Sequence, residues 1–170
     1  MREHLEDWEW AQTIVRFTER RPPDEVVQSV RAIAVVGQRV VVCRLPDGTA
    51  FLPGGTREQG ESVDDCIRRE LTEEAGFVMQ GRPRWFAAHS GVSYHRIAYK
   101  SHAPFPLKAW LWGVVKGEIL TPPTNPVGAE QVATVSVMRP EDALDVLKDE
   151  GRGYAQALRY WLSLGAPIEF

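Results

Sequence analysis

The sequence contains little cysteine, no long apolar run and no excess of basic residues, and each absence excludes a class of protein. Its two cysteines, Cys43 and Cys66, match neither a metal-binding spacing nor the framework of a disulfide-rich secreted domain. No stretch reaches the roughly 18 consecutive apolar residues of a membrane-spanning helix, and the acidic start of the chain lacks the apolar core of a secretion signal. Lys and Arg number 20 against 23 Asp and Glu, and this net charge of −3 argues against nucleic acid as a partner. We therefore expect a cytoplasmic protein that binds neither nucleic acid nor membranes.

The 170 residues, 44% of them hydrophobic, are enough for one domain with its own core, so we expect a single domain over residues 1–170. β-Branched and alternating runs predict strands at 13–19, 30–36, 39–44, 84–89, 108–116 and 132–138. Helical patterns predict helices at 62–75, 140–150 and 154–164. This order of elements predicts a mixed α/β sandwich. Residues 1–20 form an N-terminal extension whose strand either joins the protein's own sheet or pairs with a second subunit in a homodimer.

The helix predicted at 62–75 carries three glutamates on or beside the face that a helix normally buries. At about 100° per residue, Glu70 and Glu74 fall inside the apolar arc and Glu73 lies at its edge. The arc is defined by Val63, Cys66, Ile67, Leu71 and Ala75. Neighbouring like charges on a helix repel each other, and a buried carboxylate without a partner costs considerably more. A cation must therefore lie among these glutamates, and Mg²⁺, which prefers oxygen ligands, suits the role better than an arginine.

The residues around this helix follow a recognisable pattern. Gly55 is followed by Glu61, by Arg69-Glu70-Leu71, by Glu73-Glu74 and by Gly76-Phe77. These nine positions, spread over 23 residues, resemble the Nudix box, the signature of the Nudix hydrolases, and every fixed position matches. The resemblance implies an α/β/α sandwich with a mixed β-sheet, in which the box forms a loop–helix–loop motif.

The resemblance also implies a reaction and a cofactor. Nudix hydrolases use Mg²⁺ or Mn²⁺ to cleave a pyrophosphate bond in a nucleoside diphosphate linked to another moiety. Nucleotide sugars, dinucleoside polyphosphates and nucleoside triphosphates all remain open as the small-molecule substrate. The alternative is a Nudix-like sensor that binds a nucleotide without hydrolysing it. Such modules often lose box carboxylates, whereas this sequence keeps all four box glutamates, which favours an enzyme.

Roles for individual residues follow from the same resemblance. It assigns metal binding to Glu70, Glu74, Glu73, Glu61 and the backbone of Gly55. Arg69 would pair with a carboxylate and hold it in orientation. A general base must take a proton from the attacking water. Two candidates remain for it: Glu73, or an acid in the loop before the last strand, which in this sequence is Glu130.

A long acid-free stretch follows the box. No Asp or Glu occurs between Glu74 and Glu118, whereas the same stretch contains six Lys or Arg residues and three His. Such a cationic segment steers anionic substrates, so it predicts a polyphosphate site with Arg96 and Lys100 as phosphate contacts. Tyr94, in the loop expected here, offers a ring for a base to stack on. The alternative for the whole stretch is a set of solvated strand edges.

Overall fold

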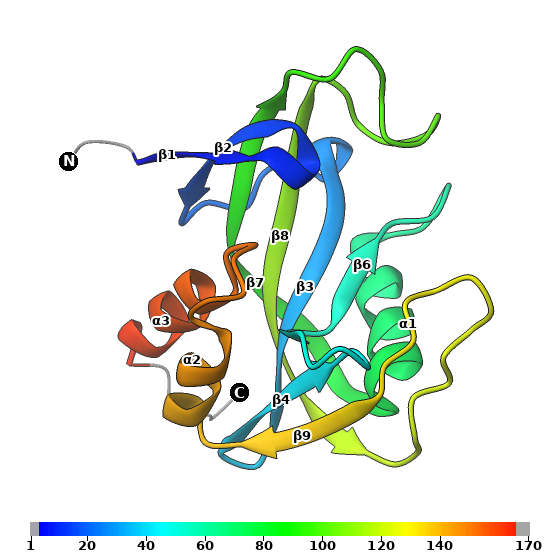
Figure 1. Ribbon diagram of the computed structural model, residues 1–170, viewed down its shortest axis with the longest axis vertical. Coiled ribbons are helices and arrows are strands. Elements are labelled where there is room, and N and C mark those ends of the chain that lie inside the picture. The colour runs from blue at the N-terminus through cyan, green and yellow to red at the C-terminus, as the bar shows by residue number, and fades with distance from the viewer. Residues whose placement is uncertain (1–3, 166–170) are drawn as a thin grey trace.

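The computed structural model describes residues 4–165, and within that range nine strands form one sheet flanked by helices (Figure 1). The strands are β1 (Leu5–Trp8), β2 (Thr13–Thr18), β3 (Val27–Val36), β4 (Arg39–Arg44), β5 (Ala50–Phe51), β6 (Gly54–Thr56), β7 (Phe77–Ser93), β8 (Leu107–Ile119) and β9 (Thr134–Met138). The helices are α1 (Val63–Ala75), α2 (Pro140–Leu147) and α3 (Tyr154–Ser163), with short 3-10 helices η1 (Glu9–Ala11) and η2 (Asp24–Val26). None of the helices in the described range is long and apolar enough to cross a membrane.

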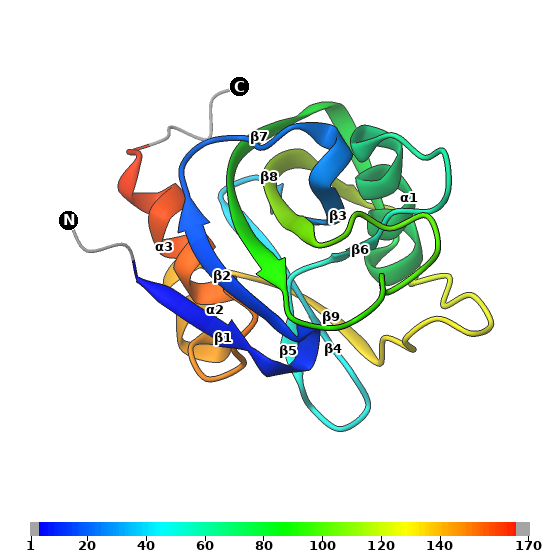
Figure 2. The same cartoon turned by 90° about the horizontal axis from the view of Figure 1, so that it is seen from above.

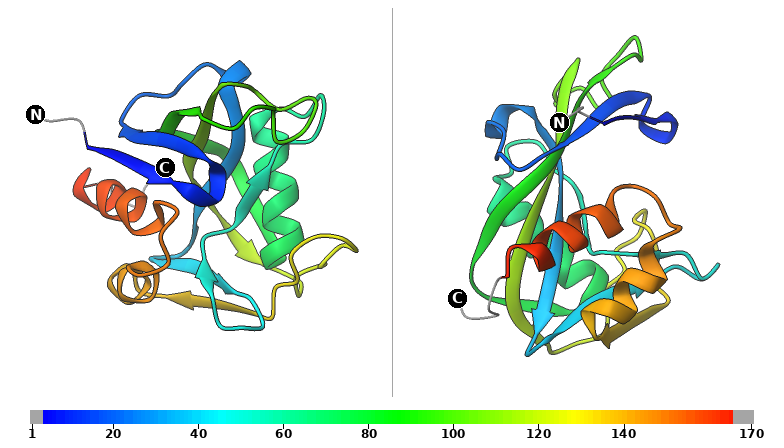
Figure 3. Two further views of the ribbon diagram at one scale, coloured as in Figure 1. Left: turned by 45° about the horizontal axis from the view of Figure 1, so that its top comes forward. Right: turned by 90° about the vertical axis from the view of Figure 1, so that its left-hand side faces the viewer.

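The elements stack in three layers. The sheet lies between α1 on one side and α2 with α3 on the other (Figure 3). Its main path runs β1-β2-β7-β8-β3-β4-β5, with β6 paired to β3 and β9 paired to β4. The β3–β8 pair is parallel and the other pairs are antiparallel, so the sheet is mixed. The expected α/β/α sandwich with a mixed sheet is confirmed.

Helix α1 has the boundaries that its sequence predicts. Ser62 caps the N-terminus, because its hydroxyl accepts a hydrogen bond of 3.0 Å from the backbone N–H of Asp65. Gly76 ends the helix in the left-handed conformation, with φ of 59°, and a Cβ atom there would overlap the carbonyl of Thr121. The apolar side of α1 is buried in the main core, which includes Ile67 and Leu71. These caps fix the rotation and end point of the helix that carries the box glutamates.

Strand β7 departs most from the sequence prediction. It spans Phe77–Ser93 instead of 84–89, because the Gly81-Arg82-Pro83 segment, which is typical of a turn, lies inside the strand. The pairing of β7 with β8 absorbs it through an irregularity between Gln80 and Arg84. The last two helices also end earlier than predicted, at Leu147 and Ser163.

The N-terminal strands join the protein's own sheet. β2 pairs with β7, with Thr13 opposite Ser93 and Thr18 opposite Ala88, and β1 pairs with β2. Seen from above, β1 and β2 lie on one side of the fold and α1 on the other, with β3 between them (Figure 2). The first of the two alternatives for the segment 13–19 therefore holds, whereas the homodimer stays a prediction.

Candidate functional site

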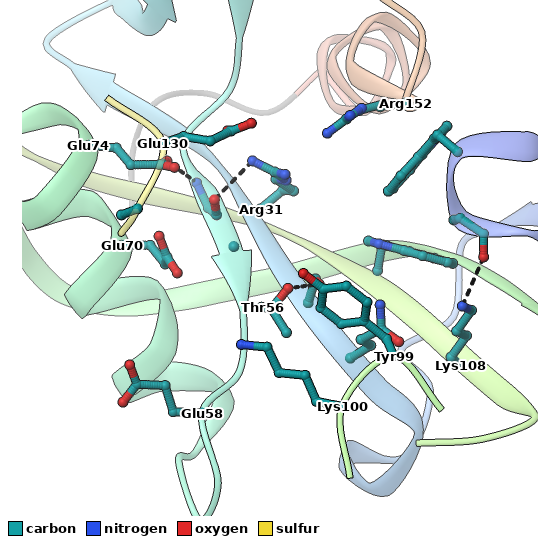
Figure 4. A pocket seen from close by; sticks show the side chains of 18 of the residues that line it. Arg31, Thr56, Glu58, Glu70, Glu74, Tyr99, Lys100, Lys108, Glu130 and Arg152 are labelled. Atoms are coloured by element: carbon teal, nitrogen blue, oxygen red, sulfur yellow. Dashed lines mark hydrogen bonds between the residues drawn. The ribbon is translucent and has the colours of Figure 1, made fainter. Parts of the chain in front are cut away.

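A cleft of about 880 Å³ runs across the sheet between α1 and the antiparallel pair β1–β2, which we call the N-terminal hairpin. At one end it is lined by Glu70, Glu73 and Glu74 of α1, which we call the glutamate end. The opposite wall contains Trp10, Tyr99 and Trp110, which we call the aromatic end. Figure 4 shows the labelled side chains converging on this cleft from strands, from α1 and from loops. The acid-free stretch that follows the box supplies Tyr99 and Trp110.

The glutamate end is buried as its helical position predicts. Glu70 is 8% exposed and Glu74 is 9% exposed. The backbone N–H of Gly54 donates a hydrogen bond of 2.9 Å to Glu74 Oε2. A Cβ atom at Gly55 would overlap the carboxylate of Glu70, so a side chain there would displace that carboxylate from its position. The sequence prediction that both carboxylates lie on the buried face is confirmed.

Arg69 holds three of the box glutamates together. Its Nε and Nη2 atoms donate to the two oxygens of Glu61 at 2.7 and 3.0 Å, a bidentate pair. Its Nη1 atom donates to Glu70 at 3.0 Å and to Glu73 at 3.2 Å, and Nη2 also reaches the carbonyl of Thr56 at 3.2 Å. Partial burial opposes the charge of Glu61, but the hydrogen bonds from Arg69 and from the Glu58 backbone lower its pKa overall. This geometry suits an orienting role for Arg69 and places Glu61 behind the residues that line the cleft.

Burial works against the charge of the two inner glutamates. Desolvation raises the pKa of Glu74 to about 8, although Arg31 and the N–H of Gly54 oppose the shift. Desolvation also raises the pKa of Glu70 from its ordinary value, with Arg69 opposing. The positive charges around each carboxylate therefore do not fully offset its loss of hydration, and a bound cation would provide the missing charge.

Arg31 is the functional candidate that the sequence analysis missed. It projects from β3 into the cleft, and its Nη1 atom donates to the carbonyls of Leu52 at 3.3 Å and Gly54 at 2.9 Å (Figure 4). It interacts electrostatically with Glu70 and Glu74. The signal was present, because Arg31 is the single charged residue in the run from Val30 to Val36. A cation in a buried strand calls for a partner.

The donor chemistry of the glutamate end fits a hard divalent cation. Glu70, Glu73 and Glu74 supply carboxylate oxygens and Gly55 a backbone carbonyl, the ligand types that Mg²⁺ prefers. Within residues 4–165, no three acidic, His or Cys side chains already converge as a preformed metal cage. Arg69 and the N–H of Gly54 occupy some of the carboxylate oxygens instead. The residues fit the ion in chemical type.

The remaining predicted site residues divide into two groups. Glu130 and Lys100 line the cleft, and Glu130 lies near Glu74 and Arg31 in Figure 4. Arg96 and Tyr94 are exposed and do not line it. The hydroxyl of Tyr94 instead donates a hydrogen bond of 3.0 Å to Asp7.

Two further cations at the cleft also escaped the residue-by-residue prediction. Lys108, at the start of β8, and Arg152, in the turn before α3, both line it. The guanidinium of Arg152 lies over the ring of Trp10, 4.3 Å from the ring centroid. Lys108 belongs to the acid-free stretch, whereas nothing local in the sequence connects Arg152 with the site.

Comparison with known proteins identifies the family. The family model of the NUDIX domain matches residues 26–160. No curated protein sequence matches the chain. Among solved structures, a mutant of the pyrophosphohydrolase BsRppH from Bacillus subtilis is similar, with a TM-score of 0.66 and 15% identity over 97% of this chain and 98% of that one.

Two other solved structures share the fold. A NUDIX hydrolase from Nitrosomonas europaea has a TM-score of 0.56 at 15% identity, covering 84% of this chain and 93% of that one. A UDP-X diphosphatase has a TM-score of 0.53 at 19% identity, covering 88% of this chain and 67% of that one. Identities this low carry the fold and not the substrate. Because the family model spans most of the sequence and the box is complete, with its glutamates on α1 lining the cleft, the chain belongs to the Nudix family of pyrophosphohydrolases.

Proposed function

We propose that the protein is a Mg²⁺- or Mn²⁺-dependent hydrolase that cleaves a pyrophosphate bond in a nucleoside diphosphate linked to another moiety. The substrate would be a nucleotide sugar, a dinucleoside polyphosphate or a nucleoside triphosphate. The observation that carries this proposal is the burial of Glu70 and Glu74 at one end of a cleft that also contains Lys100, Lys108 and Arg152. Carboxylates suited to a metal and cations suited to phosphate thus share one cavity.

The residues divide the work of phosphoryl substitution. Glu70, Glu74, Glu73 and the carbonyl of Gly55 would hold the divalent cation, with Glu61 as an outer or additional ligand. The ion supplies Lewis-acid polarisation of the phosphoryl group and a bound water of lowered pKa. Arg69 keeps the carboxylates in place, because it bonds to three glutamates at once.

Proton transfer and charge neutralisation complete the reaction. Glu73 or Glu130 would take the proton from the attacking water as its oxygen bonds to phosphorus. The bond to the bridging oxygen then breaks, and the second phosphate leaves with that oxygen. Arg31 and Lys100 would neutralise the charge on the phosphates, which in such reactions spreads over the transferred group and the leaving oxygen. The products are two phosphate-bearing fragments.

A substrate screen with product identification tests the proposal. Nucleotide sugars, dinucleoside polyphosphates and nucleoside triphosphates would be incubated with the protein and Mg²⁺ or Mn²⁺, and the products identified by mass spectrometry in H₂¹⁸O. We expect hydrolysis of at least one class, with ¹⁸O in the phosphate that water attacked. Tight nucleotide binding without turnover across the panel would instead establish the nucleotide-binding sensor.

We also propose a cellular compartment and an oligomeric state for the protein. We expect a cytoplasmic protein whose partner is a small nucleotide, and a homodimer in which the edge strand β1 takes part. Sedimentation at micromolar concentration checks the dimer: a species of single-chain mass would contradict it. The single domain over residues 1–170 is likewise a proposal, and a single cooperative unfolding transition would support it.

A further inference from the structure

Gln28 lies at the wall of the cleft with an unused hydrogen-bond acceptor. It is 7% exposed, lines the cleft, and its Oε1 atom has no hydrogen-bond partner within residues 4–165. A buried amide oxygen without a partner destabilises the fold, because it has lost its hydrogen bonds to water and gained none in return. An amide oxygen has two lone pairs, so Gln28 offers two acceptor positions inside the cleft. Such an atom calls for a donor that a ligand would bring.

A β-bulge aims Gln28 at the cleft. The pairing of β3 with β8 shifts register between Val27 and Ser29, so Gln28 is the extra residue of β3 at this point. Bulges re-aim side chains beside functional sites. As a result Gln28 and its neighbour Ser29 both line the cleft, although successive strand residues normally face opposite sides.

Lys108 supplies donors on the adjacent strand. Its side chain is 6% exposed and lines the same cleft, and β8 pairs with β3 at this level, with Ala109 opposite Val27. Its Nζ atom donates one hydrogen bond of 3.1 Å to the carbonyl of Ala11, seen at the right of Figure 4. An ammonium has three N–H donors, so donors remain for a ligand. Burial lowers the pKa of Lys108 from its ordinary value, which reflects how far the group is removed from water.

Exposed aromatic rings flank this pair. Trp10 is 48% exposed and Tyr99 is 66% exposed, and both line the cleft. Trp10 is held by Arg152 over its ring and by edge contact with Trp110, whose ring centroid is 5.7 Å away. It belongs to the N-terminal hairpin, outside the residues 26–160 that match the family model.

We propose that Gln28, Lys108, Trp10 and Tyr99 form a nucleobase subsite that selects guanine. A guanine edge places two N–H donors, N1–H and the 2-amino group, beside the carbonyl oxygen O6. The two N–H groups would donate to Gln28 Oε1, O6 would accept from the Lys108 ammonium, and the ring would stack on Trp10 or Tyr99. Adenine lacks the carbonyl, and uracil and cytosine lack the paired donors beside it. The inference rests on the proposed function in one respect, that the ligand is a nucleotide.

Binding of nucleoside monophosphates tests the subsite separately from catalysis, because these probes contain no pyrophosphate bond. Titration calorimetry of the wild-type protein with GMP, AMP, UMP and CMP should show GMP binding tightest, by about tenfold or more. The near-isosteric variant Gln28→Met should remove this preference, with Gln38→Met in the exposed β3–β4 turn as its matched control. Trp10→Ala should weaken all four nucleotides by roughly tenfold, since stacking tolerates every base, whereas Phe105→Ala should leave them unchanged.

The melting temperature distinguishes the proposed role of Gln28 from a purely structural one. A purely structural role predicts that Gln28→Met lowers the melting temperature. Because Gln28→Met replaces an unpartnered buried oxygen by an apolar group, its melting temperature should equal or exceed that of the wild type. Any one of four results would overturn the proposal: equal affinity for the four monophosphates, tightest binding of AMP, no binding of any of them, or a Gln28→Met variant that keeps the GMP preference. GMP selectivity without hydrolysis of any substrate would refute the catalytic proposal alone. Hydrolysis with equal kcat/KM for all four bases would refute the subsite alone.

Discussion

At the glutamate end of the cleft, the functional side chains come from one short stretch, in which Gly55 and the three glutamates of α1 lie within twenty positions of each other. At the aromatic end, Trp10, Tyr99 and Trp110 come from three segments that only the folded sheet brings together. The first arrangement rests on a capped helix held by Arg69, and such a rigid support suits chemistry that tolerates little displacement. The second uses a hairpin and a loop, elements that vary without disturbing the core. If the two proposals hold, the molecule separates the reaction from the recognition of the substrate.

Removing a carboxylate from the glutamate end should produce the largest effect of any change in the cleft. Glu70→Gln keeps the shape of the side chain but removes the charge that would bind the cation, and we expect kcat to fall by about 10³-fold or more, since metal activation contributes several kcal/mol. Glu118→Gln, which removes one exposed carboxylate from β8, is the matched control and should retain full activity. Metal-dependent turnover that persists in Glu70→Gln would contradict the proposed mechanism.

Identifying the general base would show whether every catalytic residue lies on α1. Glu73 already bonds to Arg69 at 3.2 Å, whereas Glu130 is exposed in a loop that lines the cleft beside Arg31. We therefore expect Glu130→Gln to lower kcat by about 10²-fold or more, in line with the usual contribution of a general base, and Glu73→Gln to lower it less. Steady-state kinetics at saturating metal measures both. A loss of less than about tenfold in Glu130→Gln would eliminate Glu130 and leave the base on the helix.

The glutamate end could be predicted from the sequence because its geometry is local. A helical repeat of 3.6 residues fixes where Glu70 and Glu74 point once the apolar arc is known, and the caps at Ser62 and Gly76 are local signals as well. The structure confirms that both carboxylates are buried. The three-layer fold followed from the order of elements and from the resemblance carried by the box.

The aromatic end could not be predicted in the same way, because strand register decides it. Gln28 faces the cleft only because β3 has a bulge against β8, and Arg152 arrives from a turn far along the chain. Of the residues predicted in the loop after β7, Lys100 lines the cleft, whereas Tyr94 and Arg96 do not, and Tyr99 of the same loop lines it without having been predicted. Composition identified the cationic segment, but only the tertiary structure selects which of its side chains reach the site.

Arg31, which lies between the two ends, should matter for stability as well as for substrate. Arg31→Met removes the donor to the carbonyls of Leu52 and Gly54, and it removes the positive charge that opposes the raised pKa of Glu74. We expect a loss of about 2 kcal/mol in the free energy of unfolding, measured by urea denaturation.

Arg44→Met provides the control for this loss. Arg44 also donates to a backbone carbonyl, that of Gly48, but in an exposed turn, and its replacement should cost less than about 1 kcal/mol. Equal losses in the two variants would mean that Arg31 is an ordinary surface contact and not part of the site.

The smallest effect concerns the support behind the aromatic end, where His89 of β7 is fully buried against Trp8. The indole N–H of Trp112 donates to His89 Nδ1 at 2.9 Å, so the other nitrogen carries the proton and donates to Gln156 at 2.7 Å. Burial lowers the pKa of His89 below its ordinary value near 6.5, against smaller opposing effects of Gln156 and Glu6. The folded protein therefore binds this proton less readily than the unfolded chain does.

The sign of the pH dependence follows from linkage. The contribution of neutral His89 is fully present above about pH 6.5 and is lost as pH falls toward its lower folded-state pKa, by about 1.4 kcal/mol per unit of the pKa shift. Glu74, with a pKa of about 8, titrates in the same pH range, and its effect on the free energy of unfolding has the opposite sign. The contribution of His89 is therefore obtained by subtracting the unfolding free energy of His89→Gln from that of the wild type at each pH between 5 and 8. This difference should shrink as pH falls below 6.5. A pH-independent difference for His89→Gln would mean that the ring is protonated as easily in the fold as in water, and that the aromatic end is not supported by a neutral imidazole.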